Sequence, residues 1–140
     1  MSPHPPPVFV DTHCLVALLN ADDEDHAAAA RAVAALAERR RAAAVSDWVL
    51  AEFLSGASRR AMRRAAAALV EDLRRSTLTR VVAATRADWD AAFALYRARP
   101  DKEWSFVDCT SIVICQRLPV REVLTHDHHF SQAGFHLLLG

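Results

Sequence analysis

Four acidic side chains stand at strand ends or among apolar neighbours, where a carboxylate contributes little to packing. Asp11 ends the run VFVD, and Asp127 follows the run VLT after one histidine. Glu52 lies one or two turns into a predicted helix, and Asp108 lies in the first turn of another. Because charged side chains are rarely buried unless they are paired, these four residues point to a site that carries out chemistry.

Carboxylates that are brought together cannot all stay ionised without compensation, because like charges raise one another's pKa. A divalent cation supplies that compensation, and oxygen-rich sites suit Mg²⁺ or Mn²⁺ better than zinc. Asp11, Glu52, Asp108 and Asp127 are therefore candidate metal ligands. This interpretation requires a fold that gathers all four acids at one place.

Each acid also has a purely structural interpretation. Asp11 could cap the helix that follows it, and Asp127 could close a turn in THDHHF. Asp108 follows Ser105 by three residues, so the pair could form an acidic variant of the capping box. Glu52 holds no capping position, which leaves a buried salt bridge to an arginine. The joint pattern is much less expected by accident than any single member.

Hydrophobic periodicity and capping residues predict the elements that must position these acids. We expect strands at residues 8–11, 42–46, 78–84, 121–125 and 135–139. Helices are expected at residues 12–20, 25–41, 47–58, 59–76, 86–99 and 105–118, and a loop at 126–134. Strands that alternate with helices predict an α/β fold with a parallel sheet covered on both faces. Ligands of such sheets bind at the carboxyl ends of the strands, where Asp11 and Asp127 should lie.

The predicted helix containing Glu52 also carries Trp48, Val49 and Phe53, which share one of its faces. We therefore expect Glu52 to be buried among apolar side chains. The helix of residues 105–118 is apolar nearly all round and should lie in the core, with Asp108 in line with Ser111.

Composition sets broader limits. The 17 Lys and Arg residues balance 17 Asp and Glu residues, so no global charge indicates a nucleic-acid or membrane partner. The three cysteines form no CxxC pattern, and we expect buried, reduced thiols. No signal peptide or membrane-length apolar run is visible, which favours a cytoplasmic protein without a membrane partner. We expect residues 1–7 to be a flexible tail and residues 8–140 to form one domain.

The segments VFVDTH, SDWVLAEFL, DKEWSFVDCTS and VLTHDHHF resemble the PIN-domain family, and more narrowly the VapC-type toxins of prokaryotic toxin–antitoxin pairs. The resemblance spans residues 8 to about 139. It implies an α/β/α sandwich with a mostly parallel central sheet and a metal-dependent ribonuclease that leaves a 5′-phosphate and a 3′-hydroxyl. It also implies an RNA substrate, a cognate antitoxin and a homodimer.

Matched position by position, the resemblance places a catalytic and metal-binding acidic quartet on Asp11, Glu52, Asp108 and Asp127. Weaker candidates near the site are Asp101, Thr12 and Ser111. The chain departs from the family at His13, where relatives often carry serine. Arginines at helical spacing are candidates for RNA or partner contact, or form a solvated helix face: Arg59, Arg60, Arg63 and Arg64.

Three other functions compete with this interpretation. The HDHH run could bind zinc, although adjacent side chains rarely converge on one ion. A phosphatase with Asp11 as nucleophile would need a second aspartate where His13 stands. The chain could also be a catalytically inactive PIN-fold module that binds RNA or protein, although all four acids are present.

Overall fold

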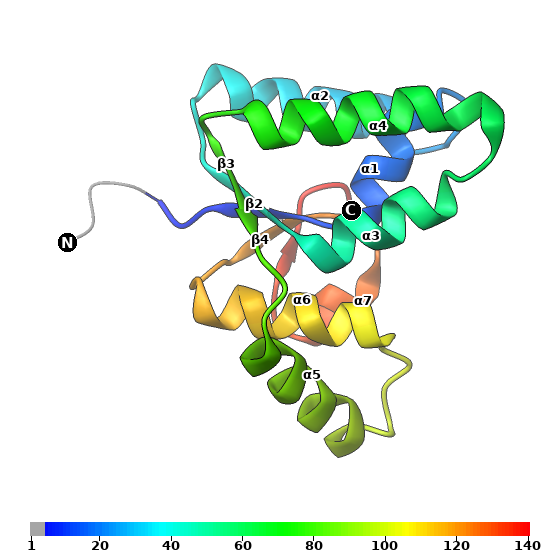
Figure 1. Cartoon of the computed structure of the whole chain (residues 1–140). Coiled ribbons are helices and arrows are strands. Elements are labelled where there is room, and N and C mark those ends of the chain that lie inside the picture. The colour runs from blue at the N-terminus through cyan, green and yellow to red at the C-terminus, as the bar shows by residue number, and fades with distance from the viewer. Residues whose placement is uncertain (1–4) are drawn as a thin grey trace.

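A five-stranded parallel sheet forms the centre of the computed structural model, which describes residues 5–140 (Figure 1). The strand order is β3-β2-β1-β4-β5. The strands are β1 (Val8–Val10), β2 (Ala43–Ser46), β3 (Thr79–Val82), β4 (Glu122–Leu124) and β5 (His136–Leu137). All four pairings are parallel, as the alternation of strands and helices predicted.

Helices cover both faces of the sheet and complete the predicted α/β/α sandwich (Figure 1). They are α1 (Thr12–Leu19), α2 (His26–Glu38), α3 (Asp47–Gly56), α4 (Arg60–Arg75), α5 (Arg86–Ala98), α6 (Phe106–Arg117) and α7 (His128–Gln132). Figure 1 shows α2 and α4 above the sheet and α5 and α6 below it. Helix α3 packs against α1, α4 and α6, and so connects the two helical layers.

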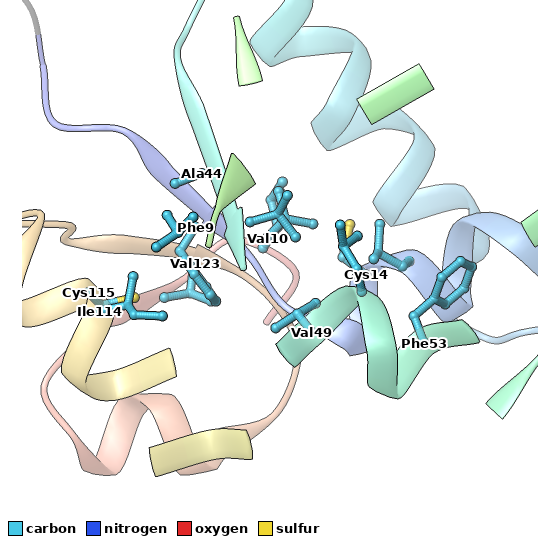
Figure 2. Close-up of a cluster of buried hydrophobic side chains, with 14 of the residues drawn as sticks. Phe9, Val10, Cys14, Ala44, Val49, Phe53, Ile114, Cys115 and Val123 are labelled. Atoms are coloured by element: carbon cyan, nitrogen blue, oxygen red, sulfur yellow. The ribbon is translucent and has the colours of Figure 1, made fainter. Parts of the chain in front are cut away.

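The core is built around β1, whose three residues are all buried. Phe9 is level with Val123 of β4, and Figure 2 shows both beside Ile114 and Cys115 of α6. Val10 points to the other face of the sheet, toward Cys14 of α1 (Figure 2). Because successive strand residues face opposite sides, a short run of apolar residues lets β1 serve both helical layers.

The strand order creates a switch point beside β1. The chain leaves β1 toward β2 on one side, whereas β4 occupies the other side. Connections that diverge in this way open a crevice at the carboxyl ends of the two strands. Asp11 follows β1, and residues 125–127 follow β4, so both segments reach this crevice.

Most of the predicted elements are confirmed, and the capping residues explain where they begin. Ser46 and Thr85 cap α3 and α5 by accepting hydrogen bonds from Val49 and Asp88 backbone N–H groups. The segment 126–134 is different from its prediction, because residues 128–132 form α7 instead of a loop. Asp127 caps this short helix, whose five residues are too few to show a helical period.

The second helix ends earlier than predicted. It stops at Glu38, and Arg40 adopts a left-handed backbone conformation with φ of 51°. Arg41 then reaches across the chain, donating to the Pro6 carbonyl at 2.8 Å and to Glu122 at 2.8 Å. Part of the segment predicted to be a loose tail is therefore tied to the domain at Pro6, and its first four residues lie outside the described range.

Candidate functional site

Asp11 is a buried carboxylate at the end of the central strand. It occupies the N-cap position of α1, yet its side chain makes no capping hydrogen bond. Instead Oδ2 accepts a hydrogen bond of 2.8 Å from the hydroxyl of Thr125, the first residue after β4. Asp11 is 5% exposed and Thr125 is fully buried. The simple capping interpretation of Asp11 is therefore wrong, and its side chain is directed toward the neighbouring strand.

The surroundings of Asp11 raise its pKa to about 6, mainly because burial disfavours the charged form. The Thr125 hydrogen bond and the Thr12 backbone oppose this shift, while the charges of Asp108 and Asp127 add to it. Two of the other predicted acids, Asp108 and Asp127, are thus close enough to Asp11 to raise its pKa. A bound cation would stabilise the charged form of a carboxylate whose pKa is raised by burial and, to a smaller extent, by neighbouring acids.

Asp108 is held at the start of α6 by two hydrogen bonds with Ser105. Its Oδ2 accepts from the Ser105 backbone N–H at 3.0 Å, and its own N–H donates to Ser105 Oγ at 3.0 Å. This is the predicted capping box, and it coexists with a place beside the other acids. His129 Nδ1 lies 3.1 Å from the same Oδ2. These side-chain hydrogen bonds of Asp108 all use Oδ2, which leaves Oδ1 for another ligand.

Asp127 is fixed in a similar way at the start of α7. Its Oδ1 accepts from the His129 backbone N–H at 2.9 Å, and its backbone N–H donates to Thr125 Oγ1 at 3.0 Å. His129 Nδ1 also lies 3.3 Å from Asp127 Oδ1. The His129 ring therefore lies between Asp108 and Asp127. One ligand atom from each of these three residues lies within 4.8 Å of the other two.

Two hydroxyls beside the acids are buried without a hydrogen-bond partner among the described residues. They are Thr12 Oγ1, next to Asp11, and Ser111 Oγ, one turn beyond Asp108. Buried polar atoms are rarely left unsatisfied, so both hydroxyls are positioned to bind a ligand or a water molecule. Both residues were weaker candidates for the site. Together with the carboxylate oxygens they provide the oxygen-rich surroundings that Mg²⁺ and Mn²⁺ prefer.

Glu52 is exposed, so the prediction that it is buried is wrong. The buried stripe of α3 runs through Val49, Leu50 and Phe53. Glu52 lies at the edge of this stripe, one turn after the half-buried Trp48. The error arises because 100° of helix rotation separates Glu52 from Phe53, which is enough to move a side chain from core to solvent. Helix α3 nevertheless packs against α1, which begins directly after Asp11, and against α6, which contains Asp108.

Asp101 has a different environment from the clustered acids. It lies in the turn after α5, and its two oxygens accept from Arg99 at 3.0 and 2.9 Å. The Arg99 guanidinium lowers the pKa of Asp101 to about 2, chiefly through these hydrogen bonds. Asp101 is therefore a charged surface residue with its own partner, and the structure gives it no contact with the acid cluster.

The four predicted contact arginines gather where α4 begins. Arg59 is the N-cap residue of α4, and all four side chains are exposed: Arg59, Arg60, Arg63 and Arg64. Arg63 donates to the Ser58 carbonyl at 3.1 Å. The group is a basic surface on the helix that follows α3, and it remains available to phosphates.

The four residues of the HDHH run do not converge, as expected for adjacent side chains. Asp127 and His129 face Asp108, whereas His126 Nδ1 contacts Asp25 at 3.2 Å. His128 belongs to neither group. A zinc site made by the run alone is therefore wrong for this structure.

Thr125 and His129 are site residues that sequence reasoning did not assign. Thr125 contacts Asp11 and Asp127, and His129 contacts Asp108 and Asp127. Both depend on the proximity of β4 to β1 and of α7 to α6, which no local pattern reveals. Their one signal in the sequence was their position on either side of Asp127.

Other sequence predictions concern the remainder of the chain. The three cysteines are free and buried, as predicted, and burial raises the pKa of Cys14 to about 12. Within residues 5–140, no helix is both long and apolar enough to cross a membrane.

Comparisons with known proteins agree with the fold. The PIN domain family matches residues 8–136 of this chain. The 23S rRNA-specific endonuclease VapC20 of Mycobacterium tuberculosis, from strains CDC 1551 / Oshkosh and ATCC 25618 / H37Rv, is 34% identical over 128 residues. That similarity covers 91% of this chain and 95% of the relative.

A solved structure is also similar. The crystal structure of Mycobacterium tuberculosis VapC20, described as a sarcin-ricin loop cleaving toxin, matches with a TM-score of 0.80 and 32% identity. The match covers 91% of this chain and 95% of the solved chain.

Proposed function

The chain belongs to the PIN-domain family, and on that premise we propose that it is a metal-dependent endoribonuclease and the toxin of a toxin–antitoxin pair. The observation that carries the proposal is the convergence of Asp11, Asp108 and Asp127 at the carboxyl edge of the sheet. Their mutual repulsion and the burial of Asp11 make this edge a receptor for divalent cations.

We propose that Asp11, Asp108, Asp127 and Glu52 hold Mg²⁺ or Mn²⁺, with the exposed Glu52 acting through bound water. The bound ion would offset the charge of a scissile phosphate, lower the pKa of a water and stabilise the leaving oxygen. The Thr12 and Ser111 hydroxyls would accept hydrogen bonds from, or donate them to, the water molecules around the ion. Asp101 is the weakest candidate, because Arg99 already occupies its carboxylate.

The other residues of the site hold the acids in place. Thr125 keeps the Asp11 carboxylate aligned, and its hydrogen bond favours the ionised form that binds cations. His129 lies between Asp108 and Asp127 and limits the rotation of both. A carboxylate that is not fully occupied by the ion would orient the attacking water and accept its proton.

We propose RNA as the substrate and 23S rRNA as the first RNA to test, because the VapC20 relative is a 23S rRNA-specific endonuclease. The basic surface at the start of α4 supplies positive charge for the phosphate backbone. A cognate antitoxin protein would keep the toxin inactive, and we propose a homodimer as the state of the free toxin.

The chemical nature of the product ends tests this proposal. Attack by water on phosphorus with loss of the 3′-oxygen leaves a 5′-phosphate and a 3′-hydroxyl. Purified protein should therefore cut ribosomal RNA in the presence of Mg²⁺ or Mn²⁺ into fragments that carry these ends. A substrate with a 2′-deoxynucleotide at the cut site should still be cleaved, since the 2′-hydroxyl takes no part.

Two results would contradict the proposal. Fragments that end in a 2′,3′-cyclic phosphate would show attack by the 2′-hydroxyl, which requires no metal-activated water. A folded protein that binds RNA but cuts no RNA with either metal would favour the inactive binding module.

A further inference from the structure

A second group of ligand-type side chains lies beside the acid cluster and takes no part in it. His13 comes from the first turn of α1, Asp25 from the residue before α2, and His126 from the segment between β4 and α7. One ligand atom from each lies within 4.8 Å of the other two. The fold thus brings Asp25 together with residues that are 12 and 101 positions away in sequence.

Both imidazoles face one carboxylate oxygen. His13 Nε2 lies 2.8 Å and His126 Nδ1 lies 3.2 Å from Asp25 Oδ2. The two rings meet edge to face, with centroids 6.2 Å apart. In a tetrahedral zinc site with bonds of about 2.0–2.1 Å, neighbouring ligand atoms lie about 3.3 Å apart. The two distances to Asp25 Oδ2 are close to this value, so the three side chains need only small movements to surround an ion.

Asp25 is turned toward the histidines instead of toward its own helix. It occupies the N-cap position of α2 but makes no side-chain capping bond, although aspartate is a preferred capping residue. The Asp25 backbone N–H donates a hydrogen bond of 2.8 Å to Asp23 Oδ1, which fixes the backbone at this position. The Asp25 side chain is only 11% exposed. The buried Asp25 carboxylate therefore interacts with His13 and His126 instead of capping α2.

The histidines leave a path for an ion and for water. Their side chains are 34% (His13) and 51% (His126) exposed, so one side of the group is open. Gly140 lies beside the His126 ring, where an added Cβ would be 3.0 Å from Cδ2. Three protein ligands with an open fourth position are typical of zinc sites that also hold a water.

We propose that His13, Asp25 and His126 form a second divalent-metal site, selective for zinc-class ions over Mg²⁺. Two imidazole nitrogens and one carboxylate oxygen suit Zn²⁺, whereas the neighbouring acids are rich in oxygen and suit Mg²⁺ or Mn²⁺. Binding at this site does not depend on the proposed nuclease function. The two sites share the segment after β4, because His126 and Asp127 are consecutive.

Ion binding requires the protons on the two rings to move. An ion bound by His13 Nε2 and His126 Nδ1 would need a lone pair on each of these two nitrogens. A singly protonated ring would then carry its proton on its other nitrogen, and a doubly protonated ring would release one proton to solvent. The ion would take the place of the contacts that both nitrogens make with Asp25 Oδ2.

The test is Zn²⁺ binding by the purified full-length chain, measured by competition with a chromophoric chelator in excess Mg²⁺ and by the shift in Tm. His13→Ala, His126→Ala and Asp25→Asn should each weaken the tight Zn²⁺ site at least tenfold and remove its Tm shift. His128→Ala is the matched control, because His128 is an exposed histidine outside both groups. It should bind Zn²⁺ as the wild type does.

His129→Ala separates the two sites, since it alters only the Asp108–Asp127 group. Retention of the tight Zn²⁺ site in His129→Ala, with loss in His13→Ala and Asp25→Asn, supports the proposal. Loss in His129→Ala with retention in His13→Ala would place zinc at the acid cluster and overturn it. A wild type without tight Zn²⁺ binding, in which His13→Ala merely lowers the Tm, would show that the group is only a hydrogen-bonded clamp.

Discussion

The Thr125 hydroxyl donates to Asp11 Oδ2 at 2.8 Å and accepts from the Asp127 backbone N–H at 3.0 Å. One buried side chain therefore connects the ends of β1 and β4, the two strands that form the switch point of the sheet. The position of the Asp11 carboxylate depends on this contact, as does the ease with which Asp11 becomes ionised.

Replacing Thr125 by valine should raise the pKa of Asp11 further, because the hydrogen bond that favours the charged form is lost. Valine keeps the shape but leaves a buried carboxylate oxygen without its donor, which costs about 1–3 kcal/mol. We expect Thr125→Val to lose activity at pH 7 and to recover part of it at higher pH. RNA cleavage and chemical denaturation between pH 6 and pH 9 would measure both effects.

Thr110→Val is the matched control for this substitution. Thr110 is also fully buried, but its hydroxyl donates to the Val107 carbonyl within α6. Its replacement should lower stability modestly with no change in the pH profile of cleavage. If Thr110→Val shifts the profile as strongly as Thr125→Val does, the link between Thr125 and Asp11 ionisation is wrong.

Asp11→Asn should stabilise the metal-free protein at neutral pH while abolishing cleavage. The native pKa of about 6 exceeds the ordinary value of 3.8, so the native state binds more protons than the unfolded state between these values. Stability is therefore full below about pH 4 and falls as pH rises through 6. A shift of two pKa units corresponds to about 3 kcal/mol at most.

Denaturation of both proteins in chelator from pH 4 to pH 8 measures this difference. The asparagine side chain of the variant carries no charge, so the variant should gain on the wild type as pH rises and should match it near pH 4. If Asp11→Asn is no more stable than the wild type at pH 8, ionisation of the buried Asp11 carboxylate does not destabilise the native state. Saturating Mn²⁺ should reduce the advantage of the variant, because the ion stabilises the wild-type carboxylate.

His129→Ala should reduce metal-dependent cleavage about 10–100-fold, the usual range for groups that orient metal-binding side chains. The His129 ring lies 3.1 Å from Asp108 and 3.3 Å from Asp127, so its removal frees both carboxylates to rotate. His128→Ala, at the exposed neighbouring position, should cleave at the wild-type rate. The Mn²⁺ concentration that gives half-maximal cleavage shows whether the loss comes from weaker metal binding. Equal cleavage rates for His129→Ala and His128→Ala would exclude a role for His129.

The basic surface at the start of α4 should contribute to RNA affinity by neutralising phosphates. Arg60→Glu with Arg64→Glu should weaken RNA binding and flatten its dependence on salt, by roughly 0.7 in slope for each phosphate of single-stranded RNA that is no longer neutralised. Arg31→Glu, at an exposed position of α2, makes half of this charge change and serves as the control for each single substitution. Binding of an end-labelled RNA across a salt series tests this, and an unchanged slope in the double variant would assign these arginines to a solvated face.

The fold could be predicted from the sequence because its signals are local. The run VFV predicts a buried strand, and Ser105 with Asp108 predicts the capping box that begins α6. The strand ends also predicted where Asp11 and Asp127 would lie. Helix α7 escaped prediction because five residues contain little more than one helical turn.

The site was harder to predict where it depends on contacts between distant segments. Thr125 and His129 matter because β4 lies beside β1 and α7 beside α6, which periodicity does not reveal. His13 was noted only as a departure from the family. Its partner Asp25 could not be distinguished from the other acids of the run DDED. The exposure of Glu52 was missed because its neighbours on α3 are apolar, although it lies just outside the buried stripe.

Cleavage of purified ribosomal RNA by the protein, free of any antitoxin, tests the central claim most directly. The reaction should be run with Mg²⁺, with Mn²⁺ and with chelator, beside Asp11→Asn and Asp108→Asn. We predict discrete cuts that require either metal and disappear in both variants. Cuts that persist in chelator, or that both variants make at the wild-type rate, would contradict a metal-dependent nuclease site built on these acids.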